Sequence, residues 1–308
     1  MKLTALAGGI GAAKLLSGLV EVMPPESLSV IVNTGDDFRW MDLYVCPDLD
    51  TVTYTLAGLA NPATGWGVRD DTFYCLERLH QLGCESWFQV GDRDLATHVF
   101  RTHRMTMGDS LTEVTRTICR QNGVVTRILP MTDSLVPTMV HTDGGTLSFQ
   151  DYFVRRRCAP QVRSFSYRGI DASRPAPGVL EAIHSADAVV LCPSNPYISI
   201  GPILAVPGVK AALLATSATV VAVTPIVAGE ALKGPAADMM RQLGTEVSAM
   251  SVAKLYLDFL DIFVVDRRDE SLVEPIAALG PQVISVETVM DSRAARISLA
   301  RSLLEMLA

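Results

Sequence analysis

The start of the chain, Lys2-Leu-Thr-Ala-Leu-Ala-Gly-Gly-Ile-Gly-Ala-Ala-Lys-Leu-Leu-Ser-Gly-Leu19, constrains the fold more than any other stretch. A short apolar run ends at a pair of glycines, and an apolar pattern at helical spacing follows it. This order predicts a buried strand, a glycine-rich loop and a helix. Glycines let a phosphate approach the backbone, and a helix N-terminus offers free N–H groups and a positive dipole end. We therefore predict that the loop and the lysine after it bind a phosphate group through Gly8, Gly9, Gly11 and Lys14.

The glycine loop alone does not identify the ligand. Lys14 stands where the dinucleotide-binding fingerprint has its third glycine, and the loop lacks the Gly-Lys-Ser/Thr ending of a P-loop. A tight strand-to-helix turn with a solvated lysine is the structural alternative.

Composition narrows the class of protein. The chain has 308 residues, of which 49% are hydrophobic, and this is enough for one large α/β domain or two smaller ones. A net charge of −7 argues against nonspecific nucleic-acid binding. No apolar run has the length of a membrane span, and the start does not read as a signal peptide. The six cysteines are scattered without a CxxC pair, which indicates reduced thiols in a cytoplasmic protein.

Strand and helix patterns alternate over most of the chain. Strands are expected at residues 28–32, 188–192, 219–223, 262–265 and 282–286, with helices between them. Repeated strand–loop–helix units predict an α/β fold with a Rossmann-like parallel sheet and helices on both faces. Residues 61–173 interrupt the alternation with helices at 71–82, 92–103 and 111–121 and a hairpin of 136–141 and 146–154. We interpret them as an inserted helical and hairpin subregion of a single domain, residues 1–308.

Four carboxylates fall in two loops near the second strand. Asp36 and Asp37 follow that strand directly, and Asp48 and Asp50 come shortly after. The carboxyl ends of parallel strands are where such sheets bind ligands, and hard oxygen ligands suit Mg²⁺. Helix capping is the alternative, since Asp50 precedes a helix expected at residues 51–60.

Two further stretches, one at a predicted helix start and one after a predicted strand, carry candidate ligand-binding residues. Asp92 and Asp94 open a predicted helix, where acids stabilise the dipole, but capping does not explain Arg93 between them. Ser194 and Asn195 follow a buried strand in a proline-rich loop and offer donors and acceptors for a base or a phosphate. A rigid structural loop is the alternative there. The five histidines show no metal-binding spacing, so we assign none to a metal.

Taken together, the motifs resemble the 2-phospho-L-lactate transferase (CofD-like) family. The resemblance covers essentially the whole chain in the right order. The motifs are Gly8-Gly-Ile-Gly-Ala-Ala-Lys14, Asn33-Thr-Gly-Asp-Asp37, Pro47-Asp-Leu-Asp-Thr51, Gly91-Asp-Arg-Asp-Leu-Ala-Thr-His98, the loop at residues 193–203, the stretch at residues 224–236 and Tyr256-x-Asp-Phe-Leu-Asp261.

The resemblance implies a transferase of coenzyme F-420 biosynthesis. Such an enzyme moves a phospho-acid from a guanosine diphosphate-linked donor to the ribityl hydroxyl of the deazaflavin Fo and releases GMP. Phospholactate, phosphoenolpyruvate and phosphoglycerate remain open as the donor acid. The family also implies Mg²⁺ and a homodimer.

Site residues are carried over from the family motif by motif. Asp50 and Arg93 match residues that contact Fo, and Asp36 and Asp50 are the candidates for metal binding and catalysis. The glycine loop, with Ser194 and Asn195, matches the guanosine nucleotide side. Whether Asp50 is the base or only a ligand stays open.

Two other functions compete with this one. A nicotinamide-dependent oxidoreductase would use the same first strand and loop, with Asp36 gripping a ribose. A non-catalytic nucleotide-binding regulator on a related fold is the second alternative.

Overall fold

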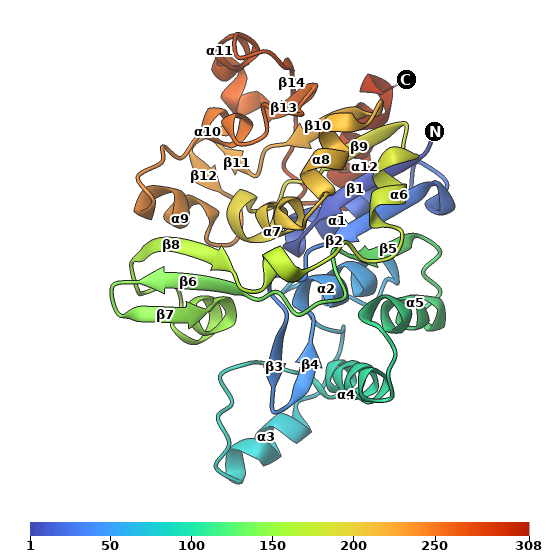
Figure 1. Cartoon of the computed structure of the whole chain (residues 1–308), viewed down its shortest axis with the longest axis vertical. Helices are drawn as coiled ribbons and strands as arrows, with labels where there is room; N and C mark the ends of the chain where they lie inside the picture. Colours follow the sequence, from blue (N-terminus) through green and yellow to red (C-terminus); the bar gives the residue numbers. More distant parts are fainter. Residues whose placement is uncertain (308) are drawn as a thin grey trace.

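Seven parallel strands form one sheet in the computed structural model, which describes residues 1–307 (Figure 1). Their order across the sheet is β14-β13-β10-β9-β1-β2-β5. The bounds are β1 Leu3–Ala7, β2 Leu28–Val32, β5 Arg127–Pro130, β9 Ala188–Leu191, β10 Thr219–Val223, β13 Ile262–Asp266 and β14 Gln282–Val286. Most of these segments are apolar runs, because a parallel sheet is covered on both faces. The predicted fold class is confirmed.

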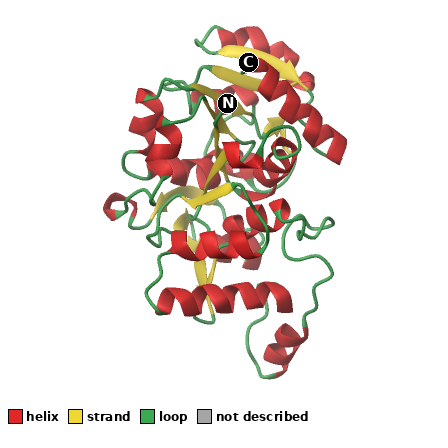
Figure 2. Cartoon of the chain, turned by 90° about the vertical axis from the view of Figure 1, so that its right-hand side faces the viewer, coloured by secondary structure: helices red, strands yellow, loops and turns green. Residues whose placement is uncertain are grey.

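Helices cover both faces of this sheet, and Figure 2 shows strands running between them. Neighbouring side chains point to opposite faces, so Leu6 of β1 joins one core and Ala5 joins the other. The Ala5 side holds α1 Gly9–Leu19, α2 Pro47–Leu56, α5 Leu111–Gln121 and α12 Arg293–Met306. The Leu6 side holds α6 Val179–His184, α7 Gly201–Ala205, α8 Val209–Ala215, α9 Ala236–Gln242, α10 Ala249–Lys254 and α11 Val273–Ala277.

The range 61–173 contains the expected helices and more strand than expected. It holds α3 Tyr74–Gln81, α4 Asp92–Thr106 and α5, the last with the capping box between Ser110 and Glu113. The hairpin is present as β6 Thr138–Thr142 and β7 Gly145–Ser148, and an unpredicted β8 Val162–Tyr167 makes a third antiparallel strand. The prediction of strand up to residue 154 is wrong, since Asp151–Arg155 is a π-helical turn.

One strand of this range belongs to the main sheet. β5 pairs with β2 at the sheet edge, although the strand–helix alternation gave no sign of it. It has only four residues and ends at Pro130, which is too short for a clear periodic signal. A second small hairpin, β3 Phe38–Trp40 and β4 Leu43–Val45, projects from the sheet beside α3 and α4 (Figure 1).

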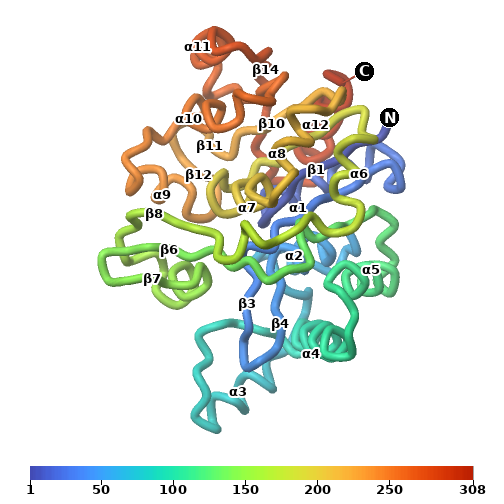
Figure 3. Tube along the Cα trace, viewed as in Figure 1, coloured from blue at the N-terminus to red at the C-terminus, as the bar shows by residue number. Residues whose placement is uncertain are grey.

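The chain changes direction across the sheet at β1. It runs from β1 to β2 and β5 on one side and then returns to β9, β10, β13 and β14 on the other. Figure 3 shows the result, with blue β1 beside yellow segments that come much later in the sequence. Open α/β sheets bind ligands outside the carboxyl ends of the strands at such a switch point.

No single helix among residues 1–307 is long and apolar enough to cross a membrane. One pair, Pro196–Ala205 and Val209–Ala215, passes on length and composition when joined across a bend of 82°.

Candidate active site

A cavity of about 620 Å³ opens at the switch point between β1 and β9. Its walls come from the loops after β1, β2 and β9, from α2 and α4, and from the loop before α9. Most of the predicted site residues line it, namely Gly8, Gly9, Gly11, Lys14, Asp36, Asp50, Ser194 and Asn195.

Arg93 is the predicted site residue that the structure leaves outside. It lies on α4 with an exposed side chain, and its guanidinium donates a hydrogen bond of 3.2 Å to the backbone oxygen of Arg69. Its backbone N–H donates to Asp71, which caps this end of α4. The proposed contact between Arg93 and Fo therefore stays a prediction.

The glycine loop is built for close packing against the loop after β9. A Cβ at Gly11 would lie 2.3 Å from the backbone oxygen of Pro193, and one at Gly8 would lie 2.6 Å from Ser199 Cβ. Ser194 adds a hydrogen bond of 2.8 Å from its hydroxyl to the backbone oxygen of Gly8. The glycines thus bring two strand ends together, whatever ligand the loop binds.

We expect Gly11→Ala to lower the free energy of unfolding by about 1–3 kcal/mol, the usual cost of forcing atoms into a packed site. The backbone oxygen of Pro193 is not the end of a flexible side chain and has little room to move. Urea denaturation measures the change. Gly144→Ala is the matched control, because its nearest contact would be 3.8 Å away at Thr142 Oγ1. Equal stability of the two variants would contradict the packing argument.

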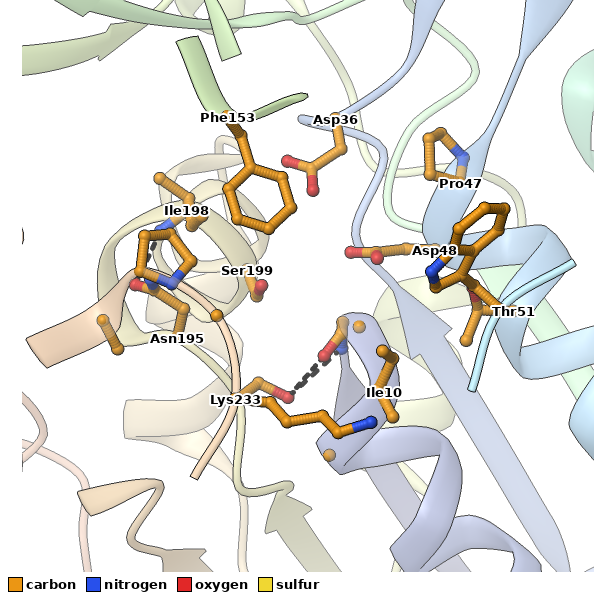
Figure 4. A pocket seen from close by; sticks show the side chains of 18 of the residues that line it. Ile10, Asp36, Pro47, Asp48, Thr51, Phe153, Asn195, Ile198, Ser199 and Lys233 are labelled. Atoms are coloured by element: carbon orange, nitrogen blue, oxygen red, sulfur yellow. Dashed lines mark hydrogen bonds between the residues drawn. The ribbon is translucent and has the colours of Figure 1, made fainter. Parts of the chain in front are cut away.

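Asp36 and Asp48 bring two carboxyl groups to the same side of the cavity, and Figure 4 shows both pointing into it. The amide of Asn33 donates a hydrogen bond of 2.9 Å to Asp48 Oδ2, and the backbone N–H of Gly9 donates to the same carboxylate. Asp36 Oδ1 is buried and has no hydrogen-bond partner within residues 1–307. Asp48 is thus fixed in place beside the first turn of α1, while Oδ1 of Asp36 remains available to bind a ligand.

Burial makes the charged form of both carboxylates costly, and repulsion from neighbouring carboxylates adds to this cost at Asp36. Burial, with the neighbouring Asp48 and Asp37 carboxylates, raises the pKa of Asp36 well above its ordinary value. Burial also raises the pKa of Asp48 to about 6, although the hydrogen bonds from Asn33 and Gly9 oppose the shift. A cation between two carboxylates favours their charged forms. The pair of Asp36 and Asp48 therefore fits a hard metal ion. The sequence analysis named Asp36 and Asp50 as the metal ligands and did not include Asp48.

Asp50 lies deeper in a charged network. It is buried and forms an ion pair with the guanidinium of Arg101, which is itself buried. Its second oxygen, Oδ2, has no hydrogen-bond partner in the described chain and is 3.7 Å from His98 Nδ1. The capping alternative for Asp50 is wrong, because α2 begins at Pro47 and Cys46 is its N-cap residue.

Asp94, His98 and Arg101 were missed as site residues. His98 Nε2 lies 3.6 Å from Asp94 Oδ1, and Tyr54 donates a hydrogen bond of 2.8 Å to that carboxylate. Burial opposes the charge of Asp94, but the hydrogen bonds and charge of His98 and the Tyr54 hydroxyl outweigh it, so the pKa of Asp94 is lowered. The available signal was their spacing at i, i+4 and i+7, which places all three on one helix face.

Two lysines and several aromatic side chains also line the cavity. Lys14 reaches the cavity from α1, and Lys233 reaches it from the loop between β12 Glu230–Ala231 and α9. The rings of Phe149 and Phe153 stack with centroids 5.3 Å apart. The aromatic residues of the lining are Tyr54, Trp66, Phe88, Phe149 and Phe153.

Fold and cavity together define a class, a Rossmann-like α/β protein with a charged ligand site at the carboxyl edge of its sheet. The family model described as "2-phospho-L-lactate transferase CofD" matches residues 3–301. The chain therefore belongs to the 2-phospho-L-lactate transferase (CofD) family, and it is a transferase.

Named relatives fall into two groups. The chain is 42% identical to "Phosphoenolpyruvate transferase" from Streptomyces griseus, with 99% of this chain and 98% of the relative covered. It is 41% identical to "2-phospho-L-lactate transferase" from Methanosarcina acetivorans, with 93% of each covered. A crystal structure of a member of the UPF0052 family from Bacillus halodurans is similar in fold, with a TM-score of 0.62, 17% identity and 98% of each chain covered.

Proposed function

We propose that this protein transfers a phospho-acid from a guanosine diphosphate-linked donor to the ribityl hydroxyl of Fo and releases GMP, as a step of coenzyme F-420 biosynthesis. The observation that carries the proposal is the charge pattern of one cavity. Two buried carboxylates and two lysines line the same space, with aromatic rings in the walls. Such a cavity suits a metal ion, a diphosphate and planar rings together.

Mg²⁺ is the ion that we assign to the buried carboxylates. Asp36 and Asp48 would hold it, and the unpartnered Oδ1 of Asp36 supports this assignment. Asp50, through its free Oδ2, is the third candidate. Bound there, Mg²⁺ would neutralise charge on the diphosphate oxygens.

Asp50 is our candidate for the proton acceptor at the Fo hydroxyl. Arg101 occupies one oxygen of its carboxylate and leaves Oδ2 without a hydrogen bond, and Asp50 lines the cavity. The hydroxyl oxygen forms a bond to the phosphorus that carries the phospho-acid, and its proton passes to Asp50. The bond from that phosphorus to the bridging oxygen breaks, and its electron pair leaves with GMP. A positioned base of this kind contributes about 10²–10⁴-fold to a rate.

Mixing experiments test the function directly. Purified protein, Mg²⁺ and Fo would be incubated with each guanylylated donor in turn, carrying phospholactate, phosphoenolpyruvate or phosphoglycerate. Mass spectrometry would detect the Fo adduct and GMP. Absence of an adduct with all three donors would overturn the proposal. A fluorescence titration with a nicotinamide nucleotide tests the oxidoreductase alternative, and Fo binding without turnover would favour a regulator.

We expect Asp36→Asn to weaken Mg²⁺ binding and to raise the Mg²⁺ concentration for half-maximal activity by about tenfold or more. Loss of a residue that only contacts a metal ligand already changes metal affinity on this scale. The reason is that the variant removes one of the two charges that would hold the ion. Calorimetric titration with Mg²⁺ gives a second readout. Asp37→Asn is the matched control, since Asp37 is buried next door but does not line the cavity. Equal Mg²⁺ dependence of both variants would rule out Asp36 as a ligand.

A further inference from the structure

Two lysines that lack an acidic partner within the described chain line the cavity. Neither Lys14 nor Lys233 forms an ion pair within residues 1–307, whereas Lys210 on the outer surface pairs with Asp258 at 2.7 Å. In a chain with a net charge of −7, two lysines that share a cavity without a counter-ion are a distinctive feature. Lys2 and Lys254 also form no ion pair within the described chain, but only Lys14 and Lys233 share a cavity, where an anionic ligand could contact both.

The two ammonium groups are close enough to influence each other. Burial lowers the pKa of Lys14, and the positive charges of Lys233 and Arg296 lower it further. Asp291 opposes this shift but does not reverse it. A bound anion would relieve the repulsion that the lysines exert on each other.

Lys233 reaches the cavity from a loop with an unusual backbone. Ala228, Gly229 and Gly234 have φ values of 50°, 74° and 76°, which bend the chain on either side of the lysine. Figure 4 shows the side chain of Lys233 extending across the cavity toward Ile10 in the glycine loop. The loop therefore carries a second cation into the space that Lys14 enters from α1.

We propose that Lys233 is a phosphate-binding residue, which clamps the donor diphosphate together with Lys14. This inference rests on the proposed transferase function and assigns a group that the glycine-loop motif does not contain. When the bond between phosphorus and the bridging oxygen breaks, negative charge accumulates on the GMP phosphate. Lys233 neutralises that charge in addition to the metal that we assign to Asp36 and Asp48.

Replacing Lys233 with methionine keeps much of the side-chain length and removes the charge. We expect the dissociation constant of GDP for Lys233→Met to rise by about tenfold, the scale of one charge-assisted hydrogen bond. Isothermal titration calorimetry measures this, with inorganic pyrophosphate as a second probe. In turnover, the KM for the donor should rise while the KM for Fo stays the same. Lys233→Arg should restore most of the affinity, because it returns a cation.

Lys254→Met is the matched control, since Lys254 is exposed and does not line the cavity. If Lys233→Met binds GDP as tightly as the wild type does, the clamp is wrong while the transferase function stands. A loss seen with GDP but not with pyrophosphate would place Lys233 at the nucleoside and also overturn the clamp. If the wild type binds neither GDP nor pyrophosphate, the proposed function fails and the clamp fails with it.

Discussion

Asp50→Asn is expected to lower turnover by about 10²–10⁴-fold, the contribution of a positioned general base, while the dissociation constant of GDP stays unchanged. The amide keeps the size of the side chain and one oxygen acceptor for Arg101, so the geometry is preserved. It removes the group that takes the proton from the Fo hydroxyl. Single-turnover product formation and GDP calorimetry would measure the two effects separately.

A matched control is needed because the same change alters a buried charge. Asp143→Asn removes a carboxylate from an exposed ion pair with Arg163 outside the cavity lining, and should leave turnover as it is. Thermal unfolding of Asp50→Asn would show whether the fold survives. Near-wild-type turnover in a folded Asp50→Asn protein would remove Asp50 from the chemistry.

Arg101→Met should produce the largest loss of stability, about 3–5 kcal/mol in the free energy of unfolding. Arg101 and Asp50 are both buried, so the variant leaves a carboxylate without its cation in a poorly solvated place. Urea denaturation followed by circular dichroism measures the change. The matched control is Arg163→Met, which breaks an exposed pair with Asp143 and should cost no more than about 1 kcal/mol.

A double variant separates the ion pair from mere packing. Replacing both Arg101 with Met and Asp50 with Asn removes the isolated charge, which is the main cost of breaking one side of a buried pair. We therefore expect the double variant to recover a large part of the stability lost in Arg101→Met. If the stability losses of Arg101→Met and Asp50→Asn add up in the double variant, the two residues are not coupled. The buried ion pair would then not explain the loss in Arg101→Met.

Local patterns were sufficient for much of the main sheet. β10 and β14 have the predicted bounds, and so does α5, which begins with a capping box. These elements carry their own apolar runs and helix caps, so neighbouring residues determine them. β5 and β8 were missed, because β5 has only four residues and most of β8 is not buried, so neither carries a clear apolar run.

The candidate site was predicted in part for the same reason. Asp36 and the glycine loop follow strands whose ends could be read from the sequence, and both line the cavity. Arg93 was expected beside them but lies on the exposed side of α4, while Arg101 from the same helix reaches Asp50. A motif shows which residues lie together in the chain, but helix rotation decides which of them enter the cavity.

By itself the sequence determined the α/β class, the family and the glycine turn that follows β1. These depend on residue order, periodicity and local backbone freedom, which need no knowledge of distant contacts. Only the tertiary structure decided that Asp36 faces Asp48, that Asp50 pairs with Arg101 and that Lys233 shares a space with Lys14. Each of these depends on how far charges are buried and on which segments fold against one another, because the interaction of two charges depends on the distance and the solvent between them.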